Sequence, residues 1–119
     1  IPSTLDAAAL CKMADRGQIK GGVVDGPLAF DLAVSPESVA TKGLKSPVAG
    51  DADILIVPAI EAGNMLAKQL DYLAGASAAG IVLGASVPII LTSRADSAEE
   101  RLASCAFASA VAHWQRDQP

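Results

Sequence analysis

Residues 52–57 read Ala-Asp-Ile-Leu-Ile-Val, a nearly continuous apolar run that ends at Pro58. Strands buried on both faces of a sheet are apolar at almost every position, so this run predicts a strand inside a parallel sheet. A helical pattern follows at once over residues 61–74. A strand that leads directly into a helix is the repeating unit of α/β folds, and the sequence therefore predicts that class.

The rest of the chain repeats this alternation of short apolar runs and helical patterns. Further strands are expected at residues 20–24, 80–83 and 88–91. Helices are expected at residues 4–16 and 30–34, from Pro36 to just before Gly43, and at about 97–115. This order predicts a mainly parallel sheet flanked by helices. In such sheets ligands bind beyond the C-terminal ends of the strands, which selects residues 25–31, 58–64 and 92–100.

Charge and composition exclude two classes of partner. The net charge is −4, and only 3% of the residues are aromatic, so neither a basic surface nor a stacking platform for nucleic acid is expected. The longest apolar stretches, residues 54–60 and 78–85, are far shorter than the roughly 20 residues of a membrane-spanning helix. We expect no membrane partner and a cytoplasmic location.

The cysteine and histidine content argues against a metal site. Cys11 and Cys105 lie far apart in helical patterns, and we expect them to be small buried hydrophobic residues in a reducing compartment. His113 is the single histidine, which leaves a His-based metal site or a Ser-His-Asp triad without support.

Ser93 and Arg94 follow one expected strand and precede a helix. A guanidinium in that position pairs well with phosphate or stabilises an oxyanion, and the Ser93 hydroxyl adds a hydrogen bond. The structural alternative is that Arg94 forms a surface salt bridge with Asp96 or Glu99.

Gly63 and Asn64 lie in another junction between a strand and a helix. Free backbone N–H groups and the helix dipole make such a junction an anion site, and Gly63 permits close approach of a ligand. The alternative is a compact turn in which Asn64 bonds only to local backbone.

The stretch Asp25-Gly26-Pro27 ends the strand expected at residues 20–24. Asp25, together with Asp31, offers carboxylates that orient a ligand or act in acid–base chemistry. Turns use the same three residue types routinely, so a purely structural role remains the alternative.

Four stretches together resemble the phosphate acetyltransferase and phosphate butyryltransferase family, in their residues, order and spacing. They are Asp25-Gly26-Pro27-Leu28-Ala29-Phe30-Asp31, Ser46-Pro47-Val48-Ala49-Gly50-Asp51-Ala52-Asp53-Ile54-Leu55, Pro58 to Asn64, and Ile90-Leu91-Thr92-Ser93-Arg94.

The resemblance implies a fold like that of isocitrate and isopropylmalate dehydrogenases, with two α/β domains and a cleft between them. It implies that this chain is the C-terminal part of such a protein. About residues 1–88 would belong to the central domain, and about residues 89–119 would be the last strand and helix, which return to the other domain. We therefore expect an N-terminal region to precede Ile1, and the full-length enzyme to be a homodimer.

The resemblance also implies a reaction, the transfer of an acetyl or butyryl group between coenzyme A and inorganic phosphate. The coenzyme A thioester is a substrate, so no cofactor is expected. Arg94 matches the arginine that stabilises the tetrahedral intermediate, and Ser93 matches the serine that positions the reacting groups. Glu100 matches the carboxylate that takes the thiol proton, although Ser97 and Glu100 also fit a capping box. The Asp25-Gly26-Pro27 turn, Gly63 and Asn64 match substrate-binding segments.

Two other functions stay open. A decarboxylating dehydrogenase of the same fold group would need metal-binding aspartates and a nicotinamide site, which the sequence does not display. A non-catalytic regulatory or dimerising domain would keep the fold and use the apolar helix at residues 61–74 as a dimer face. Binding of coenzyme A separates the catalytic from the non-catalytic alternative.

Overall fold

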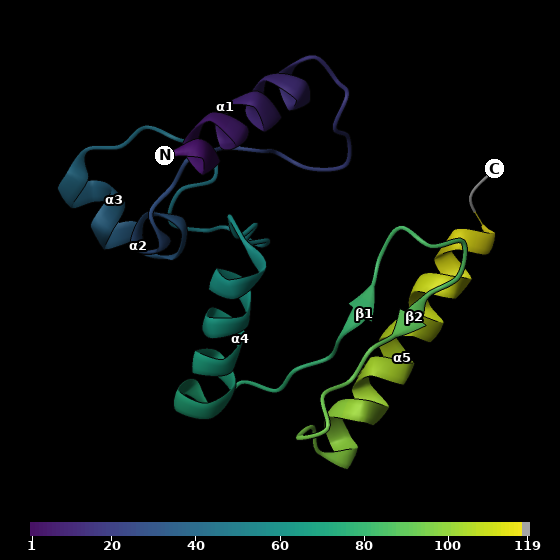
Figure 1. The fold of residues 1–119 in the computed structure, drawn as a ribbon. Coiled ribbons are helices and arrows are strands. Elements are labelled where there is room, and N and C mark those ends of the chain that lie inside the picture. Colours follow the sequence, from purple (N-terminus) through teal and green to yellow (C-terminus); the bar gives the residue numbers. More distant parts are fainter. Residues whose placement is uncertain (118–119) are drawn as a thin grey trace. The chain divides into compact units, whose positions relative to one another are not determined.

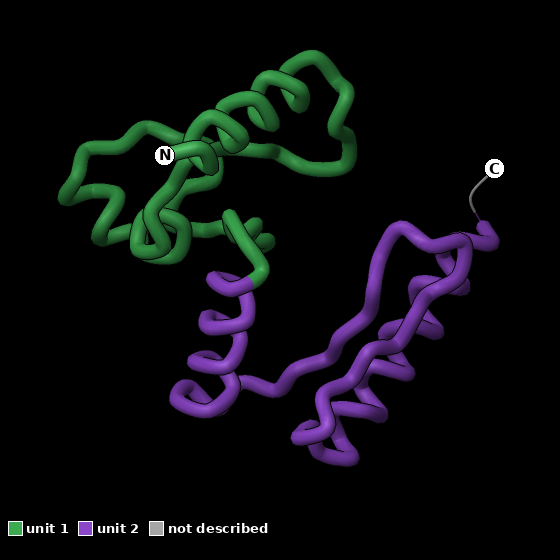
Figure 2. Tube along the Cα trace, viewed as in Figure 1, with its two compact units in different colours: residues 1–60 green, residues 61–119 purple. Residues whose placement is uncertain are grey.

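A computed structural model describes residues 1–117 of the chain. The chain divides into two compact units, Ile1–Ile60 and Glu61–Pro119 (Figure 2). The described residues form five helices and two short strands (Figure 1). The predicted α/β class is confirmed in this coarse form, with helices forming most of the regular structure.

The first unit contains three helices, and each begins and ends where the local sequence favours it. Helix α1 spans Pro2–Asp15 and has proline in its first turn, where the missing N–H is tolerated. Helix α2 spans Phe30–Val34. Helix α3 spans Pro36–Lys42, is capped by Ser35 and ends at Gly43, whose φ of 62° suits glycine. All three lie within about two residues of the predicted positions.

A buried glycine fixes the chain beside α2 and α3. The Gly50 N–H donates to the Leu32 carbonyl at 2.8 Å, and the Ala52 N–H donates to the Ala33 carbonyl at 3.1 Å. A Cβ on Gly50 would lie only 3.0 Å from the Cα of Pro36, and the φ of Gly50 is +87°. Only glycine meets both conditions without strain.

The strands predicted at residues 20–24 and 52–57 are not formed. Residues 52–57 have no strand partner, and Ile54 and Ile56 are 77% and 82% exposed. The prediction that this run is buried on both faces is wrong for the chain as described. The physical reason is that an apolar pattern records a preference for burial, whereas a strand also needs a neighbouring backbone to pair with.

The second unit begins with α4, which spans Ile60–Ala74 and ends at Gly75, where φ is 67°. Several large apolar side chains of this helix are exposed, among them Met65 at 64% and Leu73 at 84%. The helix lies where the periodic pattern predicts it, but its apolar residues remain largely in solvent.

The second unit continues with a hairpin and a long helix. Strands β1 (Ile81–Val82) and β2 (Ile89–Ile90) pair antiparallel, with Ile81 opposite Ile90. Parallel pairing is therefore wrong for these strands, because a parallel connection needs a crossover of about a dozen residues and residues 83–88 are too few. Helix α5, Ala98–Arg116, packs against both strands (Figure 1).

Ser104 ties the hairpin to α5. It is only 2% exposed, and its Oγ accepts from the Gly80 N–H at 3.0 Å and donates to the Glu100 carbonyl at 2.8 Å. A buried hydroxyl with both bonds made is satisfied, and it fixes the start of β1 against the first turns of α5.

Candidate functional site

A tight turn follows β2 and carries the predicted Ser-Arg pair. The Asp96 N–H donates to the Ser93 carbonyl at 3.2 Å, and the Ser93 N–H donates to Asp96 Oδ2 at 2.6 Å. The Ala95 N–H also donates to Ser93 Oγ at 3.3 Å. Arg94 and Ala95 are therefore the central residues of a turn that hydrogen bonds close from both ends.

The Arg94 guanidinium is exposed at this turn. Among residues 1–117, no hydrogen bond or ion pair engages it; only the Arg94 carbonyl is bonded, and it accepts from Arg101 Nη2 at 3.3 Å. The alternative salt bridge with Asp96 or Glu99 is not formed. An arginine fork with no internal partner is available to an anionic ligand.

Glu100 forms a complete capping box with Ser97 at the start of α5. The Glu100 N–H donates to Ser97 Oγ at 3.2 Å, and the Ser97 N–H donates to Glu100 Oε2 at 2.7 Å. The bond from the Ser97 backbone is the largest cause that lowers the pKa of the Glu100 carboxyl below its ordinary value. The structural role of Glu100 is confirmed, and its role as a proton acceptor stays a prediction.

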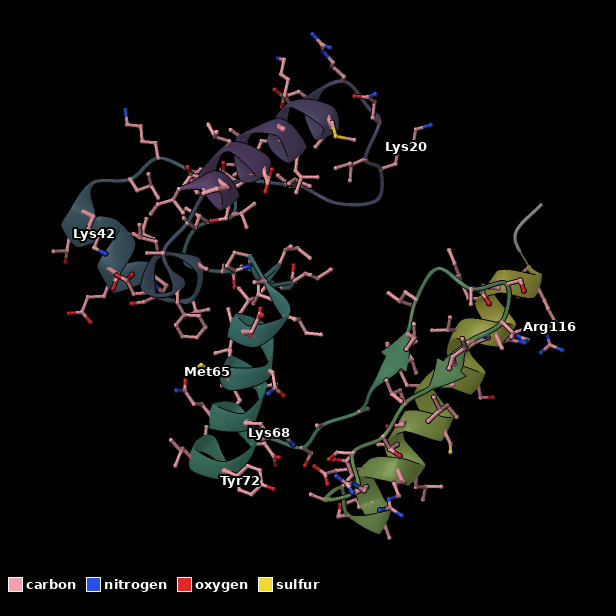
Figure 3. All side chains as sticks on the ribbon, viewed as in Figure 1. Lys20, Lys42, Met65, Lys68, Tyr72 and Arg116 are labelled. Carbon is pink, nitrogen blue, oxygen red and sulfur yellow. The ribbon has the colours of Figure 1, made fainter. Side chains whose placement is uncertain are left out.

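Gly63 and Asn64 lie at the start of the second turn of α4, beyond the backbone N–H groups that a helix N-terminus leaves free. Asn64 is exposed, so its side-chain amide rather than its backbone is open to a ligand. One turn later, Lys68 Nζ lies 3.5 Å from Asp71 Oδ2 and 5.4 Å from the centre of the Tyr72 ring (Figure 3). Substrate binding by Gly63 and Asn64 stays a prediction.

The Asp25-Gly26-Pro27 turn is bonded within the first unit. Asp25 Oδ1 accepts from the Gly26 N–H at 2.9 Å. The Gly26 carbonyl accepts from Cys11 Sγ at 3.5 Å, which joins the turn to α1. These bonds match the structural alternative for the turn, and a ligand-binding role stays a prediction.

Asp31, the second carboxylate near that turn, is already paired. Lys42 Nζ lies 2.6 Å from Asp31 Oδ2 and joins α3 to α2 (Figure 3). This hydrogen bond is the largest cause that lowers the pKa of the Asp31 carboxyl. Asp31 therefore acts as a local ion-pair partner rather than as a free carboxylate beside Asp25.

The predicted site residues fall in both units. Ser93, Arg94 and Glu100 lie within one short stretch of the second unit, which also contains Asn64. The Asp25 turn belongs to the first unit. Ser93, Arg94 and Glu100 thus lie within eight consecutive residues. A single site formed by them together with Asp25 and Asn64 stays a prediction.

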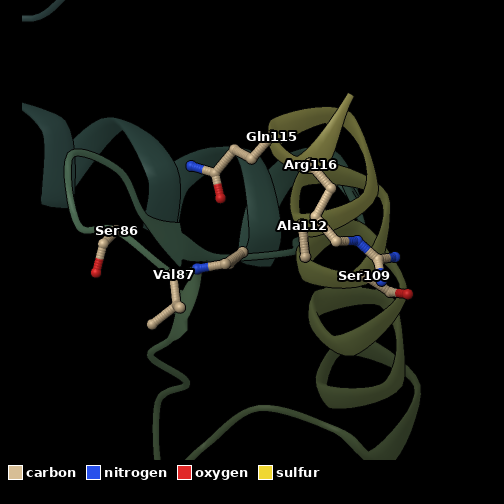
Figure 4. A pocket seen from close by; sticks show the side chains of 7 residues that line it. Ser86, Val87, Ser109, Ala112, Gln115 and Arg116 are labelled. Carbon is tan, nitrogen blue, oxygen red and sulfur yellow. The ribbon is translucent and has the colours of Figure 1, made fainter. Parts of the chain in front are cut away.

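Two hollows of the surface have no residue of the Ser-Arg turn among their walls. One of about 410 Å³ lies between the hairpin and the end of α5, beside Ser86, Ser109 and Arg116 (Figure 4). It lies toward the C-terminal end of α5, about 14–24 Å along the helix from Glu100. The other, of about 370 Å³, is in the first unit and has residues 21–23, Asp51, Asp53 and Ile54 among its walls. The segments predicted as strands there thus border one hollow without pairing.

Residues 1–117 contain no group of three or more His, Cys, Asp or Glu side chains placed to hold a metal ion. Within the same part of the chain, no helix is both long and apolar enough to cross a membrane. Cys11 is half-buried and Cys105 is exposed, so the prediction of two buried cysteines is wrong. Cys105 lies on α5, whose packing against the hairpin buries Ser104 and Ala108 instead.

Comparison with known proteins decides the family. Residues 1–109 match the family described as phosphate acetyl/butaryl transferase. The chain belongs to the phosphate acetyl/butaryl transferase family. The family predicted from the four sequence stretches is thereby confirmed, and the Ser93–Glu100 stretch falls within the matched residues.

Several curated proteins of this kind are similar over almost the whole chain. It is 66% identical over 116 residues to a phosphate acetyltransferase of Rhizobium meliloti, which covers 98% of this chain and 37% of that protein. It is 55% identical over 112 residues to a phosphate butyryltransferase of Clostridium acetobutylicum, covering 94% of this chain and 37% of that protein. The chain thus spans little more than a third of the length of these relatives.

A solved structure of the phosphotransacylase type has a similar fold. The crystal structure of a branched-chain phosphotransacylase from Enterococcus faecalis V583 aligns with a TM-score of 0.81 at 42% sequence identity. The alignment covers 95% of this chain and 40% of that one.

In this phosphate acetyl/butaryl transferase chain, two restraints on the Ser-Arg turn were not predicted from the sequence. They are the bond from the Ser93 N–H to Asp96 and the bond from Arg101 to the Arg94 carbonyl. The available signal was a repeated Ser-x-x-acid spacing, first at Ser93 and Asp96, then at Ser97 and Glu100. The second copy is the recognised capping box. The first shares only one of its bonds, from the serine N–H to the acid side chain, because the Asp96 N–H donates to the Ser93 carbonyl and not to Ser93 Oγ.

Proposed function

We propose that this chain is the C-terminal part of an enzyme that moves an acetyl or butyryl group between coenzyme A and inorganic phosphate. The observation that carries the proposal is the Arg94 guanidinium, which is exposed on a braced turn and has no partner among residues 1–117. Membership of the phosphate acetyl/butaryl transferase family supports the same reaction.

In the proposed reaction, the coenzyme A thiol gives up its proton and its sulfur adds to the carbonyl carbon of an acyl phosphate. The carbonyl electron pair moves onto the oxygen, and a tetrahedral oxyanion forms. Arg94 donates hydrogen bonds to that oxygen, and the Ser93 hydroxyl donates a hydrogen bond that orients the reacting groups. Collapse of the oxyanion breaks the bond to phosphate, and the reverse sequence makes acyl phosphate and free thiol.

Glu100 is the proposed acceptor of the thiol proton. Its Oε2 already accepts from Ser97, so we assign proton transfer to Oε1. The lowered pKa of Glu100 keeps the carboxylate ionised at neutral pH, and it also makes the group a weaker base. The Asp25-Gly26-Pro27 turn, Gly63 and Asn64 are proposed to bind the acyl-CoA substrate, without a metal or a further cofactor.

For the complete protein we propose the two-domain, isocitrate dehydrogenase-like architecture with a mainly parallel sheet, in the cytoplasm and as a homodimer. Residues 1–88 would belong to the central domain, and residues 89–119 to the end that returns to the other domain. The exposure of the apolar run at residues 52–57 supports this, since Ile54 and Ile56 then gain strand neighbours. Among residues 1–117, Ala33 and Ala108 are the only buried apolar side chains.

The test is release of free thiol from acetyl-CoA or butyryl-CoA. The complete protein should release thiol only when phosphate is present, and this 119-residue chain alone should release none above background. Absence of phosphate-dependent release by the complete protein contradicts the proposed reaction. Robust turnover by the chain alone contradicts the proposal that it is one part of the enzyme.

The exposed apolar residues of α4 favour a second candidate, a non-catalytic dimerising domain. Such a domain should bind no coenzyme A. Equilibrium binding of coenzyme A to the complete protein therefore separates the two candidates.

A further inference from the structure

Asp96 stands two residues after Arg94 and has no part in the proposed chemistry. Its side chain is half-buried, although Ala95 and Ser97 on either side are exposed. The carboxylate accepts from the Ser93 N–H at 2.6 Å, and the Asp96 N–H returns a bond to the Ser93 carbonyl. Bonds from an N–H to an ionised carboxylate are shorter and stronger than neutral ones.

These two bonds restrict the residues between them. Arg94 and Ala95 form the centre of the turn. Closing the turn from both ends limits their backbone dihedral angles, and therefore the direction in which the Arg94 side chain leaves the backbone. Arg101 Nη2 adds a third restraint, at 3.3 Å from the Arg94 carbonyl. The Ala95 N–H occupies an acceptor position of Ser93 Oγ, which leaves the Ser93 hydroxyl proton free to donate.

The bond from the Ser93 N–H to the Asp96 carboxylate also keeps that carboxylate from pairing with Arg94. Asp96 is one of the acidic side chains near Arg94 in the sequence, and an ion pair between them would occupy the guanidinium. Because the carboxylate instead accepts from Ser93, Arg94 keeps its donors for an anion.

We propose that Asp96 is a positioning residue: it closes the turn from Ser93 to Asp96 and thereby aims both Ser93 and Arg94 at the reacting acyl group. This inference rests on the proposed function. Because the proposed role is to orient Ser93 and Arg94, loss of Asp96 should lower kcat and leave KM for the substrate unchanged.

The kinetic test uses the complete protein. Asp96→Ala should lower kcat roughly 10- to 100-fold while KM for acyl-CoA stays unchanged. Asp96→Asn keeps an oxygen that accepts from Ser93 and should recover most of the rate. The matched control is Glu99→Ala, which removes an exposed carboxylate from the same stretch and should retain full turnover. Full turnover of Asp96→Ala, or an equal loss in Glu99→Ala, overturns the proposal.

A coupling test separates positioning from general stability. In an Arg94→Lys background the turn has lost the group that it aims, so Asp96→Ala should reduce kcat much less than it does in the wild-type background. An equal loss in both backgrounds shows that Asp96 does not act through Arg94.

An NMR measurement that needs neither substrate nor turnover tests the Asp96 bond separately from the proposed function. In NMR spectra of the complete protein, the Ser93 amide proton should resonate downfield, and this shift should vanish in Asp96→Ala but persist in Asp96→Asn. An unchanged Ser93 resonance in Asp96→Ala refutes the positioning bond. Failure of acyl transfer by the wild-type complete protein refutes the proposed function instead.

Discussion

Replacing Glu100 by glutamine in the complete protein should separate its two roles. A glutamine oxygen can still accept from the Ser97 N–H, which now lies 2.7 Å from Oε2, and glutamine suits this capping-box position as well as glutamate does. Glutamine cannot take a thiol proton. We therefore expect kcat to fall by about 10²- to 10⁴-fold, the usual loss for a general base, with almost no change in the unfolding transition.

Ser97→Ala is the matched variant, because it removes the other half of the capping box and leaves the carboxylate in place. Loss of a serine cap costs about 0.5–2 kcal/mol. The bond from the Glu100 N–H to Ser97 Oγ is 3.2 Å long, at the weak end for N–H···O bonds, so we expect about 0.5–1 kcal/mol. Turnover should stay within a small factor of the wild type.

The assays are phosphate-dependent thiol release for turnover and urea unfolding followed by circular dichroism for stability. The account requires turnover to fall in Glu100→Gln and stability to fall in Ser97→Ala. Near-normal turnover of Glu100→Gln would leave Glu100 as a helix cap alone, and the proton acceptor would then lie elsewhere.

Three further predictions concern stability. The pKa of Glu100 is lowered in the fold, so the ionised carboxylate contributes to stability above its ordinary pKa of 4.5. That contribution is lost as the pH falls through the lower pKa of the folded state. Circular dichroism should show this loss of stability in acid for the wild type and not for Glu100→Gln. Ser104→Ala leaves the Gly80 N–H without its partner and should lower the free energy of unfolding by about 1–3 kcal/mol, whereas an unchanged urea midpoint would contradict the bridge. Gly50→Ala places a Cβ 3.0 Å from Pro36 at a φ of +87° and should cost about 1–3 kcal/mol, which thermal unfolding would show as a lower midpoint.

The helices could be predicted because their signals are local. Ser35 and Ser97 cap α3 and α5, and Gly43 ends α3 in the left-handed conformation that glycine favours. Each signal acts within a few residues of the bond that it predicts, so no tertiary partner is needed to interpret it.

The strands could be predicted only in part, because pairing is not local. Residues 52–57 have the composition of a buried strand, yet the sequence of that run does not specify which strand would pair with it. The hairpin of β1 and β2 lies where the apolar runs predict strands, and the short connection at residues 83–88 dictates its antiparallel sense.

The capping box at Ser97 could be predicted from the sequence and is present in full. That Ser93, Arg94 and Glu100 form the catalytic site stays a prediction. The structural alternative for Arg94 was a surface salt bridge with Asp96 or Glu99, which charge and spacing alone allow. The structure assigns the Asp96 carboxylate to the Ser93 backbone, a choice that only the turn geometry makes.

Turnover of Arg94→Ala in the complete protein tests the central claim most directly. A donor aimed at a developing oxyanion contributes about 2.7–4 kcal/mol in the transition state, so kcat should fall about 10²- to 10³-fold with little change in stability. Arg94→Lys keeps the charge but loses the planar fork of donors, and it should recover only part of the rate. Near-normal turnover in both variants, with a slightly lower melting temperature, would contradict the account and leave Arg94 a surface residue without a part in the chemistry.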